Sequence, residues 1–153
     1  MAVRIVRLGS ARARGEGVRI GTVRRPPRGV PKSEYGHRNF FDVWLPELAP
    51  SAPLVKWALS QPWSDRRWAT YRRRYLAEMH RPPAQRLLSM LSALSHTANF
   101  SVGCYCDDEQ RCHRSLLARL LRDHGAAVRD SASRYRKRQR SSGSAVDARR
   151  PGR

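Results

Sequence analysis

Three cysteines and an adjoining histidine-arginine pair are the residues of this sequence whose types and spacing could do chemistry. Cys104, Cys106 and Cys112 lie within nine residues, and His113 and Arg114 follow the last of them directly. A nearby cation or a helix N-terminus lowers the pKa of a thiol, and the thiolate is a nucleophile. The free N–H groups of a helix N-terminus also bind anions. The pattern therefore favours a site for an anionic ligand beside a thiol.

The residues alone leave three interpretations of this cluster open. Buried cysteines behave as small apolar side chains, so the cluster could be structural. In a catalytic site, Cys112 would be the nucleophile beside His113, and Arg114, Ser115 and Cys104 would contact the ligand. In a metal site, the three cysteines and His113 would supply four donors, although C-x-C-x5-C-H is not the paired C-x2-C pattern of common zinc modules. We carry forward the second interpretation, with no metal ligand assigned and the cofactor unknown.

The cluster sits where a predicted strand runs into a predicted helix. NFSVGCYC, at residues 99–106, is rich in strand-forming residues, and two residues that are two apart on a strand share a face. We therefore expect Cys104 and Cys106 to project together. The leucine pattern after Cys112 predicts a helix that ends at Gly125.

Earlier in the chain, apolar residues alternate with arginines in VRIVRL at residues 3–8 and in VRIGTV at residues 18–23, which predicts two further strands. The following RRPPRGVPK predicts a stiff, extended loop that presents Arg24, Arg25, Arg28 and Lys32, against which an anion could bind. Helices are predicted at residues 53–60, from an N-cap at Ser64 to Met79, and after the prolines at 82 and 83. The last of these has an apolar stripe that we expect to be buried: Leu87, Leu88, Met90, Leu91 and Leu94.

Strands near both ends with helices between them predict a small, single-domain, layered α/β fold, with a mostly parallel sheet flanked by helices. Ligands of such folds bind at the carboxyl edge of the sheet. If the three strands are neighbours, the loop from Arg24 to Arg28 and the start of the helix at Cys112 meet at that edge. The domain is predicted to span residues 1–125, and residues 126–153 are predicted to be a disordered basic tail.

The chain carries a formal net charge of +19, of which the predicted tail contributes +7. The leading hypothesis is a small anionic ligand, a nucleotide or a phosphorylated compound, bound beside the thiol. The charge also favours polyanions, so the alternative is a nonenzymatic protein that binds nucleic acid nonspecifically through the basic surface and tail, or a regulatory protein. The first ten residues, MAVRIVRLGS, contain no apolar run long enough for a signal peptide or a membrane span. We expect a cytoplasmic protein with reduced thiols and no membrane partner.

Several stretches, taken in order, resemble the domain-of-unknown-function 488 family, the YeaO-like proteins. They are RIGTVRRPPRGVPK at residues 19–32, PELAPSAPLVKWA at residues 46–58, W-x2-Y-x3-Y-x2-E at residues 68–78 and C-x7-C-H-R at residues 104–114. The resemblance implies a compact bacterial α/β protein and supplies no substrate or cofactor. It also marks Arg24, Pro27, Arg28 and Gly29 as candidate ligand contacts, whereas Val23 replaces an acidic residue that is common in the family.

Overall fold

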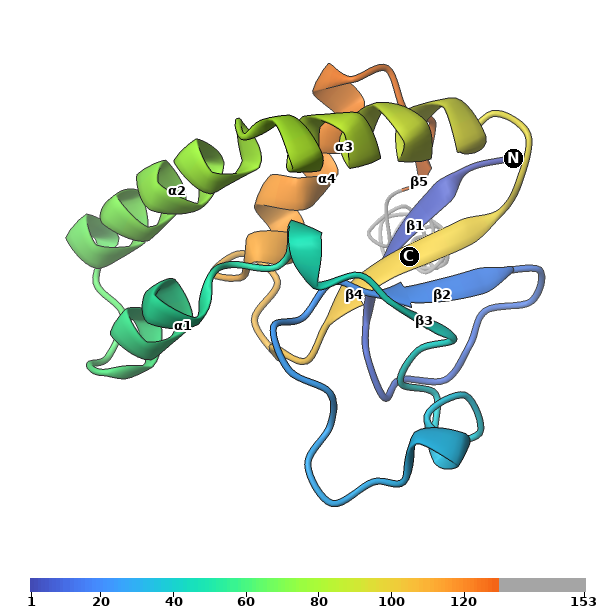
Figure 1. Cartoon of the computed structure of the whole chain (residues 1–153), viewed down its shortest axis with the longest axis horizontal. Helices are drawn as coiled ribbons and strands as arrows, with labels where there is room; N and C mark the ends of the chain where they lie inside the picture. Colours follow the sequence, from blue (N-terminus) through green and yellow to red (C-terminus); the bar gives the residue numbers. More distant parts are fainter. Residues whose placement is uncertain (130–153) are drawn as a thin grey trace, which may run out of the picture.

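The computed structural model describes residues 1–129, which form a two-layer α/β domain (Figure 1). The strands are β1 (Val3–Arg7), β2 (Val18–Gly21), β3 (Val43–Trp44), β4 (Phe100–Cys104) and β5 (Val128–Arg129). The helices are α1 (Ala52–Leu59), α2 (Asp65–Met79), α3 (Pro82–Leu94) and α4 (His113–Asp123), with short 3-10 turns η1 (Lys32–Glu34) and η2 (Pro46–Leu48). The predicted small α/β fold is confirmed.

The five strands pair in the order β3-β2-β4-β1-β5, and each pair is parallel. The three predicted strands are therefore neighbours, with β4 between β1 and β2. β3 and β5 have two residues each and were not predicted. β5 lies beyond the boundary predicted at residue 125, and the predicted tail from residue 130 onward lies outside the described residues.

One face of the sheet carries the helices. Alternate residues of three strands, which include Ile5, Ile20 and Val102, join buried residues of α1 to α4 in a single core. The two connections that contain the α-helices, β3 to β4 and β4 to β5, run in the same direction across the sheet, which places their helices on one face. On the other face, Phe41 lies so close to Gly21 that a Cβ there would be 2.3 Å from its ring.

The local signals for the helices are correct, because caps and stripes depend on nearby residues. Ser64 caps α2 by accepting a hydrogen bond from the backbone N–H of Arg67, and Ser51 caps α1 in the same way. Gly125 follows α4 with a φ of +85°. The predicted stripe of α3 is wrong at two positions, since Met90 and Leu94 are 55% and 39% exposed. No helix among residues 1–129 is both long and apolar enough to cross a membrane.

A buried polar network stabilises the face opposite the helices. Arg19 and Glu16 form an ion pair with an Nε–Oε1 distance of 2.7 Å, and their side chains are 0% and 2% exposed. Glu16 also accepts from the hydroxyl of Ser101 in β4, and Arg19 donates to the carbonyl oxygens of Ser10 and Asn39. Two loops and two strands are thus joined at one pair of charges.

Candidate functional site

The three cysteines, His113 and Arg114 lie at the carboxyl edge of the sheet, where β4 ends and α4 begins. Figure 1 shows the loop that joins these two elements. Strand β4 ends at Cys104 and not at Cys106, and a loop leads to Cys112, the N-cap residue of α4. The Cys112 sulfur accepts from the backbone N–H of Arg114 at 3.5 Å, so a thiol occupies a position usually held by a serine, threonine, aspartate or asparagine oxygen.

The three thiols converge. The Sγ atoms of Cys104 and Cys106 are 3.5 Å apart, as expected for side chains that project together, and all three Sγ atoms lie within 4.8 Å of one another. Cys104 and Cys112 are buried, whereas Cys106 is exposed. All three are free thiols, so the site presents one exposed cysteine beside two buried ones.

His113 is buried beside the thiols in a fixed orientation. Its Nε2 lies 2.7 Å from the carbonyl oxygen of Thr22, which can only accept, so Nε2 carries the hydrogen. Nδ1 then has a free lone pair, and it lies 3.9 Å from the Cys112 sulfur. Burial lowers the pKa of His113, which favours the neutral ring at neutral pH.

Arg114 is the second buried polar residue of the site, and only 4% of it is exposed. Its Nη2 donates to the backbone oxygen of Asp107 at 3.4 Å, and its Nε has no hydrogen-bond partner. Among residues 1–129 no carboxylate forms an ion pair with Arg114, and the carboxylate of Asp107 pairs instead with Arg7. A buried positive charge with an unused donor therefore lies at this edge.

The surroundings make the three thiols inequivalent. Hydrogen bonds from Cys104 and then Cys112, followed by the charge of Arg114, lower the pKa of Cys106. The hydrogen bond to Cys106 raises the pKa of Cys104 to about 11, and hydrogen bonds to its two neighbours together with burial raise that of Cys112. The arrangement favours Cys106 over Cys112 as the reactive sulfur, and sequence reasoning had given Cys106 no catalytic role.

The loop after β2 meets the start of α4 through its backbone, as the expected edge site requires. Thr22 receives the hydrogen bond from His113, and the hydroxyl of Tyr105 donates to the carbonyl oxygen of Arg25 at 3.3 Å. The loop after β2 therefore contacts the site through its backbone carbonyl oxygens. Its sequence does not indicate these backbone contacts.

The other predicted ligand contacts, Arg24, Arg28 and Ser115, either use their side chains in hydrogen bonds to backbone carbonyl oxygens or lie exposed on a loop. The Arg24 guanidinium donates to the carbonyl oxygens of Pro46, Ala49 and Pro50 at 3.0, 3.2 and 2.9 Å, so it ties the loop to the segment before α1. Arg28 is exposed on the loop. The Ser115 hydroxyl donates to the carbonyl oxygen of Cys112 at 2.8 Å within the first turn of α4.

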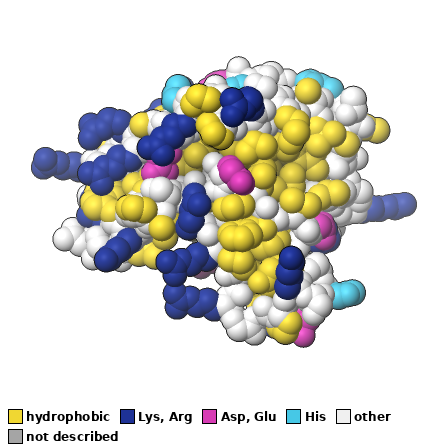
Figure 2. Space-filling model, viewed as in Figure 1, with side chains coloured by type: hydrophobic (Ala, Val, Ile, Leu, Met, Phe, Trp, Pro, Cys, Tyr) yellow, Lys and Arg dark blue, Asp and Glu magenta, His cyan; other side chains and the backbone are white. Residues whose placement is uncertain are grey.

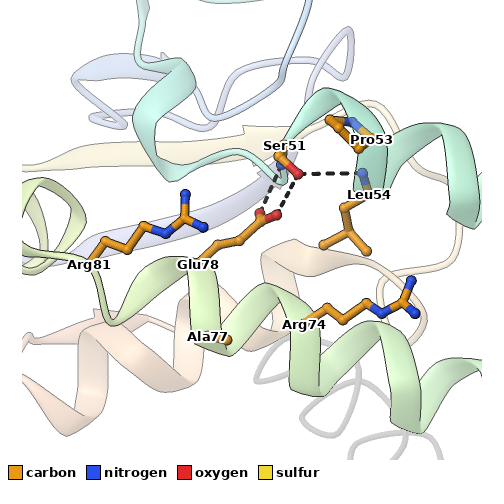
Figure 3. A pocket seen from close by; sticks show the side chains of 7 residues that line it. All are labelled: Ser51, Pro53, Leu54, Arg74, Ala77, Glu78 and Arg81. Carbon is orange, nitrogen blue, oxygen red and sulfur yellow. Dashed lines mark hydrogen bonds between the residues drawn. The ribbon is translucent and has the colours of Figure 1, made fainter.

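A separate hollow of about 340 Å³ lies between α1 and α2 (Figure 3). The carboxylate of Glu78 points into the start of α1 and accepts from both the backbone N–H and the hydroxyl of Ser51. Arg74 and Arg81 extend on either side of that carboxylate. Because Glu78 already receives two hydrogen bonds as part of the cap of α1, this hollow offers no free acid-base group.

The sequence matches the family model DUF488-N3a, described as the active DUF488-N3 subclade, over residues 3–125. A search of curated proteins and a search of solved structures each gave no match. The matched range includes every thiol of the site and ends at the glycine that follows α4.

Proposed function

The chain belongs to the DUF488-N3a family, the active DUF488-N3 subclade, and from its edge site we propose that it binds a small anionic ligand beside a reactive thiol. The ligand class is a nucleotide or another phosphorylated compound. Cys106 supplies the accessible sulfur, and Arg114 supplies the positive charge.

The observation that carries this proposal is the buried guanidinium of Arg114. A buried charge without a counter-charge is costly, and the surrounding protein normally compensates it with an acid or with hydrogen bonds. Here the Nε atom has no partner, and among residues 1–129 the guanidinium makes one hydrogen bond, which is long at 3.4 Å. A phosphate oxygen would satisfy this donor, because guanidinium groups match phosphate geometry well.

The position of the sulfur supports the same ligand class. Cys106 is exposed, so a ligand can reach it, whereas its two neighbouring cysteines are buried. The nearby N-terminus of α4 adds free N–H groups and a partial positive charge. In this proposal Cys112 and His113 are positioning residues, since one caps α4 and the other links α4 to the loop after β2.

The test is alkylation of the reduced, metal-free chain with iodoacetamide at pH 7, followed by peptide mapping. We expect Cys106 to react first and inorganic phosphate or AMP to slow its reaction. Substitution of Arg114 by Met should abolish this protection, while Arg28→Met, which removes one exposed positive charge, should retain it. Circular dichroism must show that both variants fold. If Arg114→Met does not fold, Arg114→Lys takes its place.

Two results would contradict the proposal. One is modification of all three thiols at similar rates. The other is the absence of protection of the wild-type chain by phosphate compounds at millimolar concentrations.

Nucleic-acid binding is a second candidate, and a specific surface favours it. Exposed arginines gather on α2, at positions 66, 72, 73 and 74. Figure 2 shows Lys and Arg side chains concentrated on the side of the molecule that holds α1 and α2. Multiple phosphate contacts make affinity fall steeply with salt.

Fluorescence anisotropy with a labelled oligonucleotide at low and moderate salt tests this second candidate. A double substitution, Arg72→Gln with Arg73→Gln, should weaken binding and reduce its salt dependence. Binding that is unaffected by both the salt concentration and this double substitution would contradict a role for the α2 surface.

A further inference from the structure

The three sulfur atoms of the edge site are arranged as metal ligands are. Zinc–sulfur bonds of about 2.3 Å in a tetrahedral site place ligand sulfurs ~3.8 Å apart. The sulfurs of Cys104 and Cys106 are 3.5 Å apart, and no pair among the three cysteines exceeds 4.8 Å. A shift of less than an ångström, as an order-of-magnitude estimate, would therefore bring all three onto one ion.

We propose that Cys104, Cys106 and Cys112 bind one thiophilic divalent ion of the zinc class, with the fourth coordination position open. This inference does not require the proposed anion site, although both use the sulfur of Cys106 and the charge of Arg114. Thiolates select soft and borderline ions such as Zn²⁺ and Cd²⁺ over Mg²⁺ or Ca²⁺, which prefer oxygen.

The neighbouring groups fit a thiolate-bound ion. Three thiolates and a divalent cation carry a net charge of −1, and Arg114 is a buried cation without an acidic partner among residues 1–129. The backbone N–H of Arg114 already donates to the Cys112 sulfur, which would stabilise a thiolate there. The site therefore provides both a counter-charge and a donor around the metal.

The fourth position is open because of where the neighbours lie. Nδ1 of His113 lies 3.9 Å from the sulfur of Cys112, but His113 is not part of the group in which all ligand atoms lie within 4.8 Å of one another. Cys106 faces solvent. A water molecule or an added ligand can therefore complete a tetrahedral ion from the exposed side, as in zinc sites that keep an open position.

The sequence offered a metal site only as one of three interpretations, with His113 as a fourth donor, and its spacing did not favour it. Common zinc modules pair their cysteines as C-x2-C, whereas this chain has C-x-C followed by five residues and a third cysteine. The third ligand reaches the first two because the loop after β4 returns the chain to the start of α4. The metal site is thus a property of the folded loop.

The experiment uses the full chain, reduced and stripped of metal, and titrated with Co²⁺ and then Zn²⁺. We expect intense thiolate-to-cobalt charge-transfer absorption and visible bands of tetrahedral Co²⁺, both removed by one equivalent of Zn²⁺. Native mass spectrometry should show one zinc ion per chain. Cys106→Ser, at an exposed position, should fold normally and lower zinc affinity on the order of a hundredfold.

Tyr105→Phe is the matched control, because this residue lies between two ligand positions and its hydroxyl donates a hydrogen bond to the carbonyl oxygen of Arg25. The Tyr105→Phe variant should bind metal with the affinity of the wild type. The absence of charge-transfer absorption, or an unchanged zinc affinity in Cys106→Ser, would overturn the inference. Phosphate protection of Cys106 is measured on metal-free protein, so either proposal can fail while the other holds.

Discussion

Replacement of Glu16 by Gln should destabilise the fold by about 3 kcal/mol, because it leaves the buried charge of Arg19 without its counter-charge. The two groups are joined by two hydrogen bonds, with Nε–Oε1 at 2.7 Å and Nη2–Oε2 at 3.0 Å. Both side chains are at most 2% exposed, so water cannot replace the lost carboxylate. Removal of one member of a buried pair costs roughly 3–5 kcal/mol, and glutamine retains one acceptor oxygen, which favours the lower end of that range.

Urea unfolding followed by tryptophan fluorescence measures this change. The matched control is Glu34→Gln, since Glu34 pairs with Arg38 at 3.6 Å and both side chains are about half exposed. An exposed pair of this kind contributes about 0–0.5 kcal/mol. Free energies of unfolding for the two variants that agree within about 1 kcal/mol would refute the argument that the buried pair holds the sheet.

Three further predictions concern stability. The hydrogen bond from Arg12 lowers the pKa of Asp42. Burial alone would raise the pKa of Glu16, but the hydrogen bonds that its carboxylate accepts outweigh this effect and lower the pKa. Their stabilisation is complete above their unfolded pKa values and should be lost as pH falls below about 4, which acid titration monitored by circular dichroism would show. Gly103→Ala would place a Cβ 2.8 Å from a backbone oxygen of β1 and should cost about 1–3 kcal/mol in urea unfolding. Arg24→Ala removes three hydrogen bonds and should lower the free energy of unfolding by about 1–3 kcal/mol without changing the alkylation rate of the exposed thiol, whereas a slower reaction would indicate a role at the site.

The elements that depend on local sequence could be predicted. Alternation in residues 3–8 and 18–23 predicted β1 and β2, and the serine N-cap predicted the start of α2, because these signals act within one turn or one strand. β3 and β5 have two residues each, and their pairing partners are distant in sequence. Short strands of this kind are defined by the sheet and not by their own residues.

The candidate site could be predicted in its location but not in its roles. The cysteines, His113 and the loop after β2 meet at the carboxyl edge of the sheet, as the order of elements indicated. The choice between Cys106 and Cys112 depends on burial, and burial depends on how the loop after β4 folds. The role of Arg24 could not be predicted for a similar reason, because the carbonyl oxygens that its side chain contacts lie more than twenty residues away in the sequence.

The most direct test of the edge site compares alkylation of Cys106 by anionic iodoacetate and by neutral iodoacetamide in reduced, metal-free protein. Both reagents form the same type of C–S bond and release iodide, so their rate ratio reports the charge beside the sulfur. We predict that Arg114→Met lowers this ratio about tenfold, equivalent to about 1.4 kcal/mol, while Arg28→Met leaves it unchanged. An equal ratio in the wild type and in both variants would contradict an anion site formed by Arg114 and Cys106.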